Sequence, residues 1–477
     1  MAWNIVIAGG GFAGAGVARH LEKILPKQSA RLTLVNDVNF SLYTPFLPEA
    51  AAGTLEPRHV VTPLRDIIHR ANLRLGVLDE HDPVNKTVGV RSQTGEHDTL
   101  PYDELVLALG SISRFLPIPG LSEHAVGFKS LADAIYLRNH VIETLELANA
   151  TEDPKLRERL LTYVFVGGGY AGLEALAELQ DFAADAMQHY PRARLHGMRW
   201  VLVEARDRVL PEIDIELAEY ALRELRGRGI DIQLGITLKE VTANTATLST
   251  GEVLDTSTVV WTAGVVPHPS LKKLSVPLDE LGRVKVDSDL RVEGMTGVWA
   301  LGDCASVPDA NGGTAPPTAQ HAVREAPVLA NNIAAEFGIG EKKSFDYKGG
   351  AAFVNLGRYK AVGKIGNLTF RGFPAWWMAR SYHMSQIPGL SRKIRAVIDW
   401  TASLPFSRDL SEVGSIGRPG LLDPNRYSTG GSHRPAPELP AQSEEVAEVD
   451  APAESKAPAK AKSPAKAKAK SPAKPKD

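Results

Sequence analysis

The chain has 477 residues, enough for two or three domains with separate cores, and its composition is ordinary for a globular protein. A net charge of −2 gives no general attraction to nucleic acid, and the single cysteine, Cys304, excludes an internal disulfide, a dithiol redox pair and a cysteine-rich metal site. A strand-like run begins at residue 3, so no secretory signal is expected, and no apolar stretch reaches the roughly 18 residues of a membrane span. We therefore expect a cytoplasmic protein.

The first predicted unit is a strand over residues 3–8, a glycine-rich loop, a helix to about Lys23 and a second strand over residues 31–37. The loop, IAGGGFAGAGVA, has the spacing G-x-G-x-x-G at Gly9, Gly11 and Gly14. The first glycine of this motif permits a sharp turn, the second lets the backbone approach a diphosphate, and the third lets the helix pack closely. The diphosphate then lies at the helix N-terminus, where free N–H groups favour anions.

The same unit recurs after an apolar run over residues 103–111 and a predicted helix over residues 131–149. The second loop, FVGGGYAGLEAL, places its three glycines at Gly167, Gly169 and Gly172. A helix over 174–189 follows, and then come the strand-like runs WVLVEA, TVVWTAG and GVWALGDCA. Alternating strands and helices predict a parallel α/β architecture. Two loops predict two dinucleotides, and a flavin with a nicotinamide is the economical pair because a nicotinamide can pass a hydride to a flavin.

Residues at the strand ends distinguish the two units. Glu204 ends the second strand of the second unit, where a carboxylate accepts a ribose 2′-OH and repels a 2′-phosphate, so NADH is favoured over NADPH. Arg206 and Arg208 lie close by and weaken that preference. In the first unit Asn36 stands at the corresponding place with Asp37 beside it, and the pattern leaves open which of the two binds a ribose.

The two loops, with LVLALGS, VVWTAGV and VWALGDCA, resemble the two-dinucleotide-fold flavoprotein reductases. More narrowly, NFSLYTPFLPEAAAGTLEPRHVVTPLR (39–65) and PPTAQHAVREA (316–326) resemble the type II NADH dehydrogenases, which are NADH:quinone oxidoreductases that do not pump protons. The resemblance covers about residues 3–420. It implies an α/β fold with two Rossmann-like domains, the NADH domain being inserted in the FAD domain, and a C-terminal membrane-interface domain. The expected boundaries are 1–120 and 269–342 (FAD), 121–268 (NADH), 343–425 (membrane interface or dimer) and 426–477 (disordered tail).

The resemblance also implies site residues, with FAD and NADH as the cofactors. Those assigned to FAD are Gly9, Gly11, Gly14, Asn36, Thr44, Pro45, Gly110, Gly302, Asp303 and Ala319. Those assigned to NADH are Gly167, Gly169, Gly172, Glu204 and Gly264. Glu174 and Gln320 are the expected catalytic residues, near the nicotinamide and the quinone respectively. Arg324 replaces a glutamine that family members usually carry at the quinone pocket, which changes the polarity there.

Asp303 has a case of its own, because an acid at the end of a strand faces the crevice where α/β proteins bind ligands. It cannot neutralise a phosphate, so a hydrogen bond to ribityl hydroxyls is its expected role. Disulfide reductases of this fold carry a dithiol in the first domain, and the corresponding SLYTPF has none. Cys304 is expected to be packed rather than reactive. Hydride must therefore leave the flavin for an external acceptor.

The segment from Tyr347 to Ile398 contains no Asp or Glu and nine Lys or Arg residues. Three tryptophans lie in this segment or just after it, at Trp376, Trp377 and Trp400. At helical spacing, one face carries four apolar residues, Leu390, Ile394, Val397 and Ile398. These features predict an amphipathic element over about 372–406 that lies in a membrane interface, and the alternative is a helix packed on the body or in a dimer.

The expected function is FAD-dependent transfer of hydride from NADH to flavin N5, followed by two-electron reduction of a membrane quinone. The expected location is peripheral, on the cytoplasmic face of the inner (cell) membrane, with a possible homodimer and no specific nucleic acid. One alternative is a soluble NAD(P)H-dependent ferredoxin-type reductase, which predicts no lipid binding. Another is a flavoprotein redox sensor or scaffold in which the lysine-rich tail is the working part.

Overall fold

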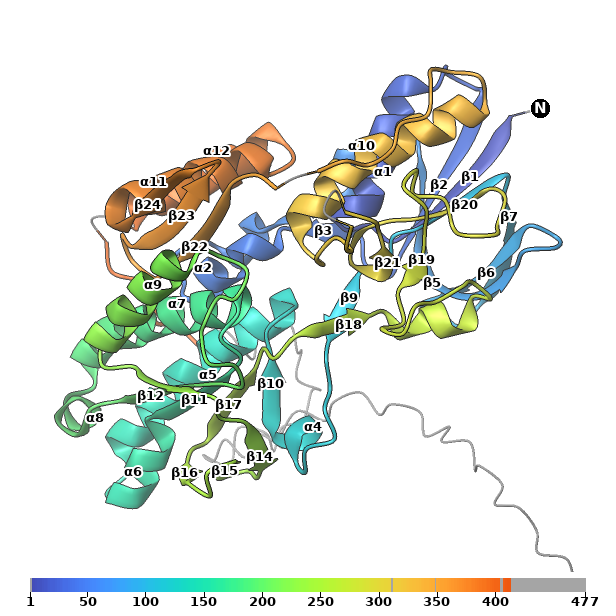
Figure 1. Ribbon diagram of the computed structural model, residues 1–477. Helices are drawn as coiled ribbons and strands as arrows, with labels where there is room; N and C mark the ends of the chain where they lie inside the picture. The colour runs from blue at the N-terminus through green and yellow to red at the C-terminus, as the bar shows by residue number, and fades with distance from the viewer. Residues whose placement is uncertain (1, 310–311, 348, 404–405, 413–477) are drawn as a thin grey trace, which may run out of the picture. The chain divides into compact units, whose positions relative to one another are not determined.

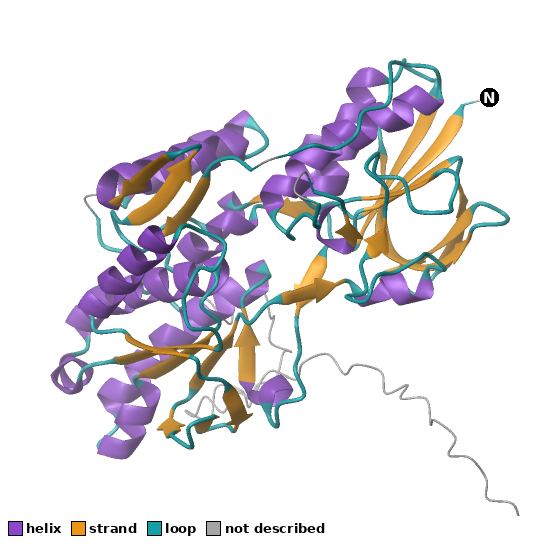
Figure 2. Cartoon of the chain, viewed as in Figure 1, coloured by secondary structure: helices purple, strands orange, loops and turns teal. Residues whose placement is uncertain are grey.

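The computed structural model describes residues 2–309, 312–347, 349–403 and 406–412. The chain divides into two compact parts, residues 1–416 and 417–477, and all described residues belong to the first part. The predicted tail over 426–477 therefore lies outside the described residues. Within residues 1–416, two sheets each alternate with helices, as the parallel α/β prediction requires (Figures 1 and 2). The first unit is the part of the chain around the first glycine loop and its sheet, and the second unit is the part around the second loop and its sheet. The residue boundaries between the domains stay a prediction.

The first sheet has seven strands in the order β20-β8-β1-β2-β5-β6-β7. Their bounds are β1 (Trp3–Ala8), β2 (Ala30–Asn36), β5 (Asn72–Asp82), β6 (Thr87–Ser92), β7 (His97–Pro101), β8 (Glu104–Leu107) and β20 (Val298–Ala300). The strands from β20 to β5 pair in parallel, and β5, β6 and β7 continue the sheet as antiparallel hairpins. Helices α1 (Phe12–Ile24) and α10 (Ala319–Glu336) pack together beside it. Because β20 returns to this sheet late in the chain, the second unit is inserted between its strands.

The second sheet has five parallel strands in the order β10-β17-β11-β12-β13. Their bounds are β10 (Ala125–Gly127), β11 (Thr162–Val166), β12 (Arg199–Glu204), β13 (Asp231–Leu234) and β17 (Thr258–Trp261). The main helices of this unit are α5 (Leu131–Ala150), α7 (Tyr170–Ala186) and α9 (Ile215–Gly227). The start of α5 is fixed by a capping box between Ser130 and Asp133. Strand β11 is buried along its whole length, as expected for a parallel strand covered on both faces.

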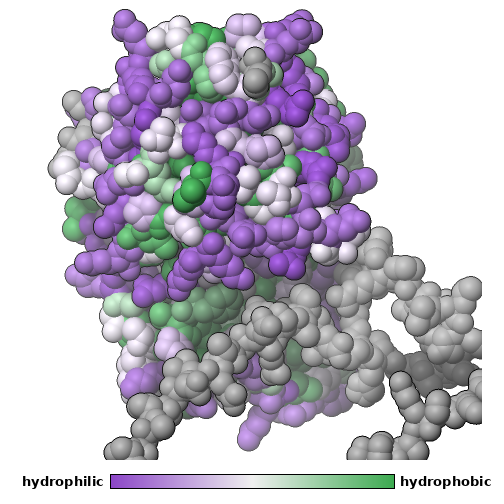
Figure 3. Space-filling view, turned by 90° about the vertical axis from the view of Figure 1, so that its right-hand side faces the viewer, coloured by the Kyte–Doolittle hydropathy of each residue, from purple (hydrophilic) through white to green (hydrophobic). Residues whose placement is uncertain are grey.

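A pair of short antiparallel strands, β9 (Ser111–Ser113) and β18 (Val265–Pro267), connects the two sheets. The other elements before α10 are β3 (Phe40–Leu42), η1 (Thr44–Phe46), α2 (Leu47–Ala51), η2 (Pro57–His59), β4 (Val61–Pro63), α3 (Leu64–Ile67), α4 (Leu121–His124), α6 (Pro154–Leu160), η3 (Met187–His189), α8 (Pro191–His196), β14 (Leu238–Val241), β15 (Thr245–Leu248), β16 (Val253–Asp255), η4 (Pro269–Lys273), β19 (Val284–Lys285), η5 (Gly302–Cys304) and β21 (Ala305–Ser306). Figure 3 views the molecule from the side of the first sheet: most of the surface is hydrophilic, and apolar side chains gather in a hollow below.

The C-terminal elements form a small antiparallel sheet and two helices. They are β22 (Ala352–Asn355), β23 (Ala361–Ile365), β24 (Leu368–Arg371), α11 (Gly372–Gln386) and α12 (Leu390–Ala402). Strand β22 contacts α7, and β23 contacts α9, so this sheet packs on the second unit. Among the described residues, every helix is too short or too polar to cross a bilayer.

Candidate active site

The first glycine loop has the geometry that its spacing predicts. Gly9 has a φ of +107°, and a Cβ there would lie 2.2 Å from the carbonyl oxygen of Ala108. A Cβ at Gly14 would lie 1.9 Å from the oxygen of Gly9, so the helix can approach the loop only without a side chain. At Gly11, just before α1, an added Cβ would meet no described atom within 4 Å. This open space in front of a helix N-terminus fits a diphosphate.

The second loop repeats each of these features. Gly167 has a φ of +114°, and a Cβ there would lie 2.8 Å from Thr262. A Cβ at Gly172 would lie 2.0 Å from the oxygen of Gly167, and at Gly169 the space is again open to 4 Å. Helix α7 begins directly after this loop. The structure therefore contains two equivalent cradles, and both fit a dinucleotide.

The strand-end residues occupy equivalent positions in the two units. Asn36 Oδ1 accepts the backbone N–H of Gly10 at 2.7 Å, and Glu204 Oε2 accepts that of Gly168 at 2.5 Å. Asn36, and not Asp37, is therefore the structural counterpart of Glu204. The side chain of Arg208 donates to carbonyl oxygens of its own loop, which weakens the case for a 2′-phosphate site there.

Asp303 lies in η5, at the end of β20, as predicted. Its Oδ2 accepts a hydrogen bond from Ser111 Oγ at 2.6 Å. Lys129 Nζ lies 3.6 Å from the same oxygen and donates to Ser111 Oγ at 3.1 Å. Lys129 precedes α5 of the second unit, so this group connects residues of both units. The sequence reasoning did not find Lys129, because no local motif marks it.

The glycines beside Asp303 bring this corner close to the first cradle. Gly302 has a φ of +72°, and a Cβ there would lie 3.2 Å from the Cβ of Ala13 in α1. The backbone N–H of Gly302 donates to Oε2 of the buried Glu325 at 2.6 Å. Burial raises the pKa of Glu325 to about 7. Gly110 and Gly264 both have positive φ and open space where a Cβ would lie.

Thr44 and Pro45 form the turn η1 and are partly exposed, whereas the flanking Tyr43 and Phe46 are buried. The ring of Tyr43 lies edge-on to that of Phe12, the first residue of α1, with centroids 5.5 Å apart. The turn is therefore next to the first cradle, where the resemblance places a flavin. Tyr43 Oη also lies 3.1 Å from Nδ1 of a histidine in α11, His383, whose pKa burial lowers to about 4.

Gln320 and Arg324 share one face of α10, which begins at Ala319 after the N-cap Thr318. Gln320 Nε2 donates to the carbonyl of Ala351, and Tyr347 Oη donates to Gln320 Oε1 at 3.4 Å. The guanidinium of Arg324 lies 4.5 Å above the Tyr347 ring. The arginine is thus held beside Gln320 by an aromatic partner that the sequence pattern did not indicate.

Glu174 lies in the first half of α7 and is partly buried. Its Oε1 accepts the backbone N–H of Asn355 in β22 at 2.8 Å. Burial raises its pKa to about 8, and the nearby carboxylates Glu49 and Glu178 add to this effect. Both neighbours are almost completely buried. The sequence reasoning missed them, although acids four residues apart on one helix were a visible signal for Glu178.

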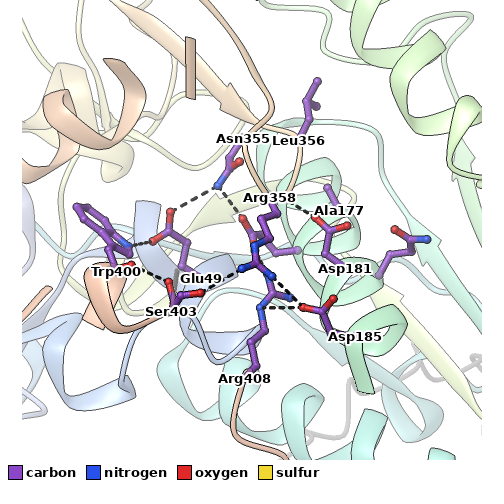
Figure 4. A network of polar contacts seen from close by, with 12 residues as sticks. Glu49, Ala177, Asp181, Asp185, Asn355, Leu356, Arg358, Trp400, Ser403 and Arg408 are labelled. Carbon is purple, nitrogen blue, oxygen red and sulfur yellow. Dashed lines mark hydrogen bonds and ion pairs between the residues drawn. The ribbon is translucent and has the colours of Figure 1, made fainter. Parts of the chain in front are cut away.

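The basic residues of the C-terminal segment are held mainly by acids of the protein. The ion pairs are Arg358–Asp185, Lys360–Glu224, Lys364–Asp214, Arg371–Glu216 and Arg380–Glu49. Trp376 is 8% exposed, and Trp400 Nε1 donates to Glu49 (Figure 4), whereas Trp377 is 61% exposed. Four of these basic residues lie before the predicted membrane-interface element over about 372–406 and fix β22–β24 to the second unit, whereas Arg380 within the element pairs with Glu49 of α2. The membrane-interface element itself stays a prediction.

Comparison with known proteins agrees with this geometry. The pyridine nucleotide-disulphide oxidoreductase family matches residues 3–326. The chain belongs to this family. Over 426 residues it is 32% identical to the probable NADH dehydrogenase of Dictyostelium discoideum, which covers 86% of this chain and 91% of the relative. It is 29% identical over 423 residues to the type II NADH:quinone oxidoreductase Ndh of Mycobacterium tuberculosis, covering 85% and 89%. Within its family the chain is therefore a type II NADH dehydrogenase.

A solved structure shows the same fold. NDH2 from Plasmodium falciparum in complex with NADH superposes with a TM-score of 0.79 at 18% identity, covering 86% of this chain and 100% of that one. FAD and NADH are the cofactors of this dehydrogenase fold, and each of the two cradles fits one of them. The buried Cys304, whose pKa burial raises to about 12, carries no thiolate at neutral pH, so this member of a disulphide oxidoreductase family works without a dithiol.

Proposed function

We propose that the chain oxidises NADH and reduces a membrane quinone by two electrons through FAD, without pumping protons. The observation that carries this proposal is the pair of matched cradles in a chain whose one cysteine is buried and inert. With no thiol to relay electrons, a diffusible acceptor must take them, and the relatives are named as quinone reductases. The test is turnover of FAD-loaded protein with NADH and a short-chain quinone. Failure to oxidise NADH in that assay would overturn the proposal.

The residues of the two cradles would bind different parts of the two cofactors. FAD, when bound, supplies the electron carrier between the two substrates. The backbone around Gly11 would hold its diphosphate, and Asp303, oriented by Ser111 and Lys129, would hold its ribityl hydroxyls. The second cradle would take NADH, with Glu204 accepting a ribose hydroxyl. We expect a preference for NADH over NADPH, because Glu204 would repel the 2′-phosphate of NADPH.

A cavity of about 510 Å³ supports an approach route for the quinone. Its lining includes Val323 of α10, which is three residues after Gln320 and so lies on the same helix face. Ile387 of the loop between α11 and α12 and Leu390 at the start of α12 form the opposite wall. A quinone entering here from a membrane surface would travel along α10 towards Gln320 and Arg324.

We also propose that the chain attaches peripherally to the cytoplasmic face of the membrane, and the exposed face of α12 supports the attachment to lipid. Its apolar residues are largely exposed: Leu390 73%, Ile394 51%, Val397 48% and Ile398 59%. An apolar face of this kind, flanked by Arg392, Lys393 and Arg395, suits an anionic lipid surface. The same helix lines the proposed quinone entrance, so an α12 that lies on lipid would hold this entrance at the membrane.

Replacing both Ile394 and Val397 with Glu is expected to abolish flotation with anionic vesicles. Turnover with a short-chain quinone should persist, because neither side chain is part of the site. Leu195→Glu replaces an exposed apolar residue outside α12, so it is the matched control and should float like the wild type. A double variant that still floats would contradict lipid attachment through α12. A wild type that does not float but sediments as a dimer would assign this face to a second copy of the chain.

Glu174→Gln is expected to lower turnover about tenfold while FAD content stays at the wild-type level. The amide oxygen can still accept the N–H of Asn355, so the fold is kept, but the side chain can no longer change its charge during the cycle. Steady-state kinetics and the flavin-to-protein ratio measure the two effects. Loss of FAD from this variant would show that the two cradles are assigned the wrong way round.

A further inference from the structure

Three polar side chains from separate parts of the chain meet beside the first cradle. Asp303 lies in η5 of the first unit, after β20, and Ser111 lies in β9, at the connection between the two sheets. Lys129 lies between β10 and α5, which both belong to the second unit. A residue of the second unit therefore reaches the corner of the first unit where the ribityl chain of FAD is expected.

The hydroxyl of Ser111 joins the other two side chains. It donates to Asp303 Oδ2 at 2.6 Å, and it accepts a hydrogen bond from Lys129 Nζ at 3.1 Å. The ammonium nitrogen of Lys129 also lies 3.6 Å from Asp303 Oδ2. Because a hydroxyl has one hydrogen to donate, the contact with Lys129 favours the orientation in which that hydrogen points at Asp303. Both contacts use Oδ2, which leaves Oδ1 as the oxygen that would accept a ribityl hydroxyl.

The backbone around Lys129 is fixed to the second unit. Its N–H donates to Asp133 Oδ2 at 2.9 Å, and the N–H of Ser130 donates to the same oxygen at 2.8 Å in the capping box that begins α5. Just before these residues, β10 pairs with β17 of the second sheet. The ammonium group can therefore stay on Asp303 only while the second unit keeps its place beside the first.

Lys129 also balances negative charge at this corner. Glu325 adds a second carboxyl group close to Asp303, because it accepts the backbone N–H of the neighbouring Gly302. The diphosphate of FAD would add further negative charge at the first cradle. The side chain of Asp303 is 18% exposed, so water screens its charge only in part. Lys129 is the basic residue that the structure pairs with this carboxylate.

We propose that Lys129 is a positioning residue for FAD, which the second unit contributes to the cofactor site of the first. It holds Asp303 in the orientation that accepts the ribityl hydroxyls, and it offsets the charge of this carboxylate beside the diphosphate. FAD therefore binds tightly only when the second unit is in place, and bound FAD in turn holds the start of α5 in place. This inference rests on the proposed assignment of the first cradle to FAD.

A double-mutant cycle on the Kd for FAD tests whether Lys129 acts through Asp303. Lys129→Met keeps the length of the side chain and removes its charge, and it is expected to raise the Kd about fivefold or more. In an Asp303→Asn background the same change should raise the Kd by less than about twofold, because the carboxylate that Lys129 holds is gone. Lys129→Arg keeps the charge and should stay within about twofold of the wild type. Lys155→Met, at an exposed lysine of α6, is the matched control and should leave the Kd unchanged.

Hydrogen exchange tests the coupling between the two units. The amides of Lys129 and Ser130 both donate to Asp133, so they report on the start of α5. In the wild type, exchange over residues 125–133 should be about tenfold slower with FAD than without it. Lys129→Met protein saturated with FAD should lose this protection. The hairpins over residues 238–255, elsewhere in the second unit, should exchange equally in all samples.

The outcomes separate this inference from the proposed function. A Gly11→Val protein that keeps its full FAD would overturn the assignment of the first cradle. If that variant loses FAD, a Lys129→Met protein with wild-type affinity, or a cycle in which the two changes simply add, would overturn the role of Lys129 alone. Equal exchange over residues 125–133 with and without FAD would overturn the coupling. If Asp303→Asn does not fold, Ser111→Ala replaces it in the cycle, because it removes the hydroxyl that joins Lys129 to Asp303.

Discussion

Gly11→Val protein is expected to purify with less than about a tenth of the wild-type FAD, whereas Gly169→Val keeps its FAD and shows a KM for NADH raised about tenfold or more. The reason lies in what a side chain meets at these two positions. A Cβ at either glycine has no described atom within 4 Å, and the φ angles of −75° and −79° suit any residue. The valine methyl groups therefore leave the fold unstrained and fill the space that each diphosphate needs.

The flavin-to-protein absorbance ratio and the KM for NADH measure this pair of effects. Gly227→Val is the control, because a Cβ at that position near the end of α9 also meets nothing within 4 Å and no ligand is expected there. It should change neither quantity. A Gly11→Val protein with full FAD but no oxidation of NADH would contradict the assignment and exchange the roles of the two cradles.

Glu49→Ala is expected to lower the free energy of unfolding by about 3–5 kcal/mol, the largest stability effect foreseen here. Glu49 is 3% exposed, and its removal leaves Arg380 buried without its ion-pair partner. Trp400 Nε1 loses its acceptor as well. Because these partners lie in α11 and α12, the loss should loosen the C-terminal helices from α2. Thermal or denaturant unfolding followed by circular dichroism measures the change.

Two further variants show whether charge or packing is responsible. Glu49→Gln keeps an acceptor for Trp400 and loses only the charge, so its unfolding free energy should lie between those of the wild type and the alanine variant. Glu219→Ala removes an exposed pair within one helix and should change stability by less than about 1 kcal/mol. Equal effects of Glu49→Ala and Glu219→Ala would show that the buried network does not hold α11 and α12.

The sequence was sufficient for the parts of the fold that local patterns determine. The strands before and after each glycine loop lie within a residue of the predicted ranges, and the long helix after the second loop ends at Ala186, near the expected 189. The glycine spacing also predicted the backbone of both cradles, because close packing at Gly14 and Gly172 allows no other residue. These features depend on neighbours in the chain.

The role of the basic C-terminal residues could not be predicted in this way. Lys360 and Lys364 pair with Glu224 and Asp214, which are more than 130 residues earlier in the chain. In the sequence, a segment with nine basic residues and no acid therefore resembles a lipid-binding surface. Only the fold shows which of these residues have acidic partners. The prediction for the apolar face of α12 depended on helical spacing alone, and the structure leaves that face exposed.

The carboxylate cluster shows the same limit. Spacing on α7 could have indicated Glu174 and Glu178, but Glu49, Asn355 and Arg408 come from three other segments. Only tertiary packing reveals that these residues meet.

The most direct test of the account is an anaerobic absorbance titration of the FAD-loaded wild type. We predict that an equimolar amount of NADH bleaches the flavin band and that an equimolar amount of a short-chain quinone then restores it. A flavin band that NADH leaves unchanged, or that quinone does not restore, would contradict the assignment of this chain as an NADH:quinone oxidoreductase.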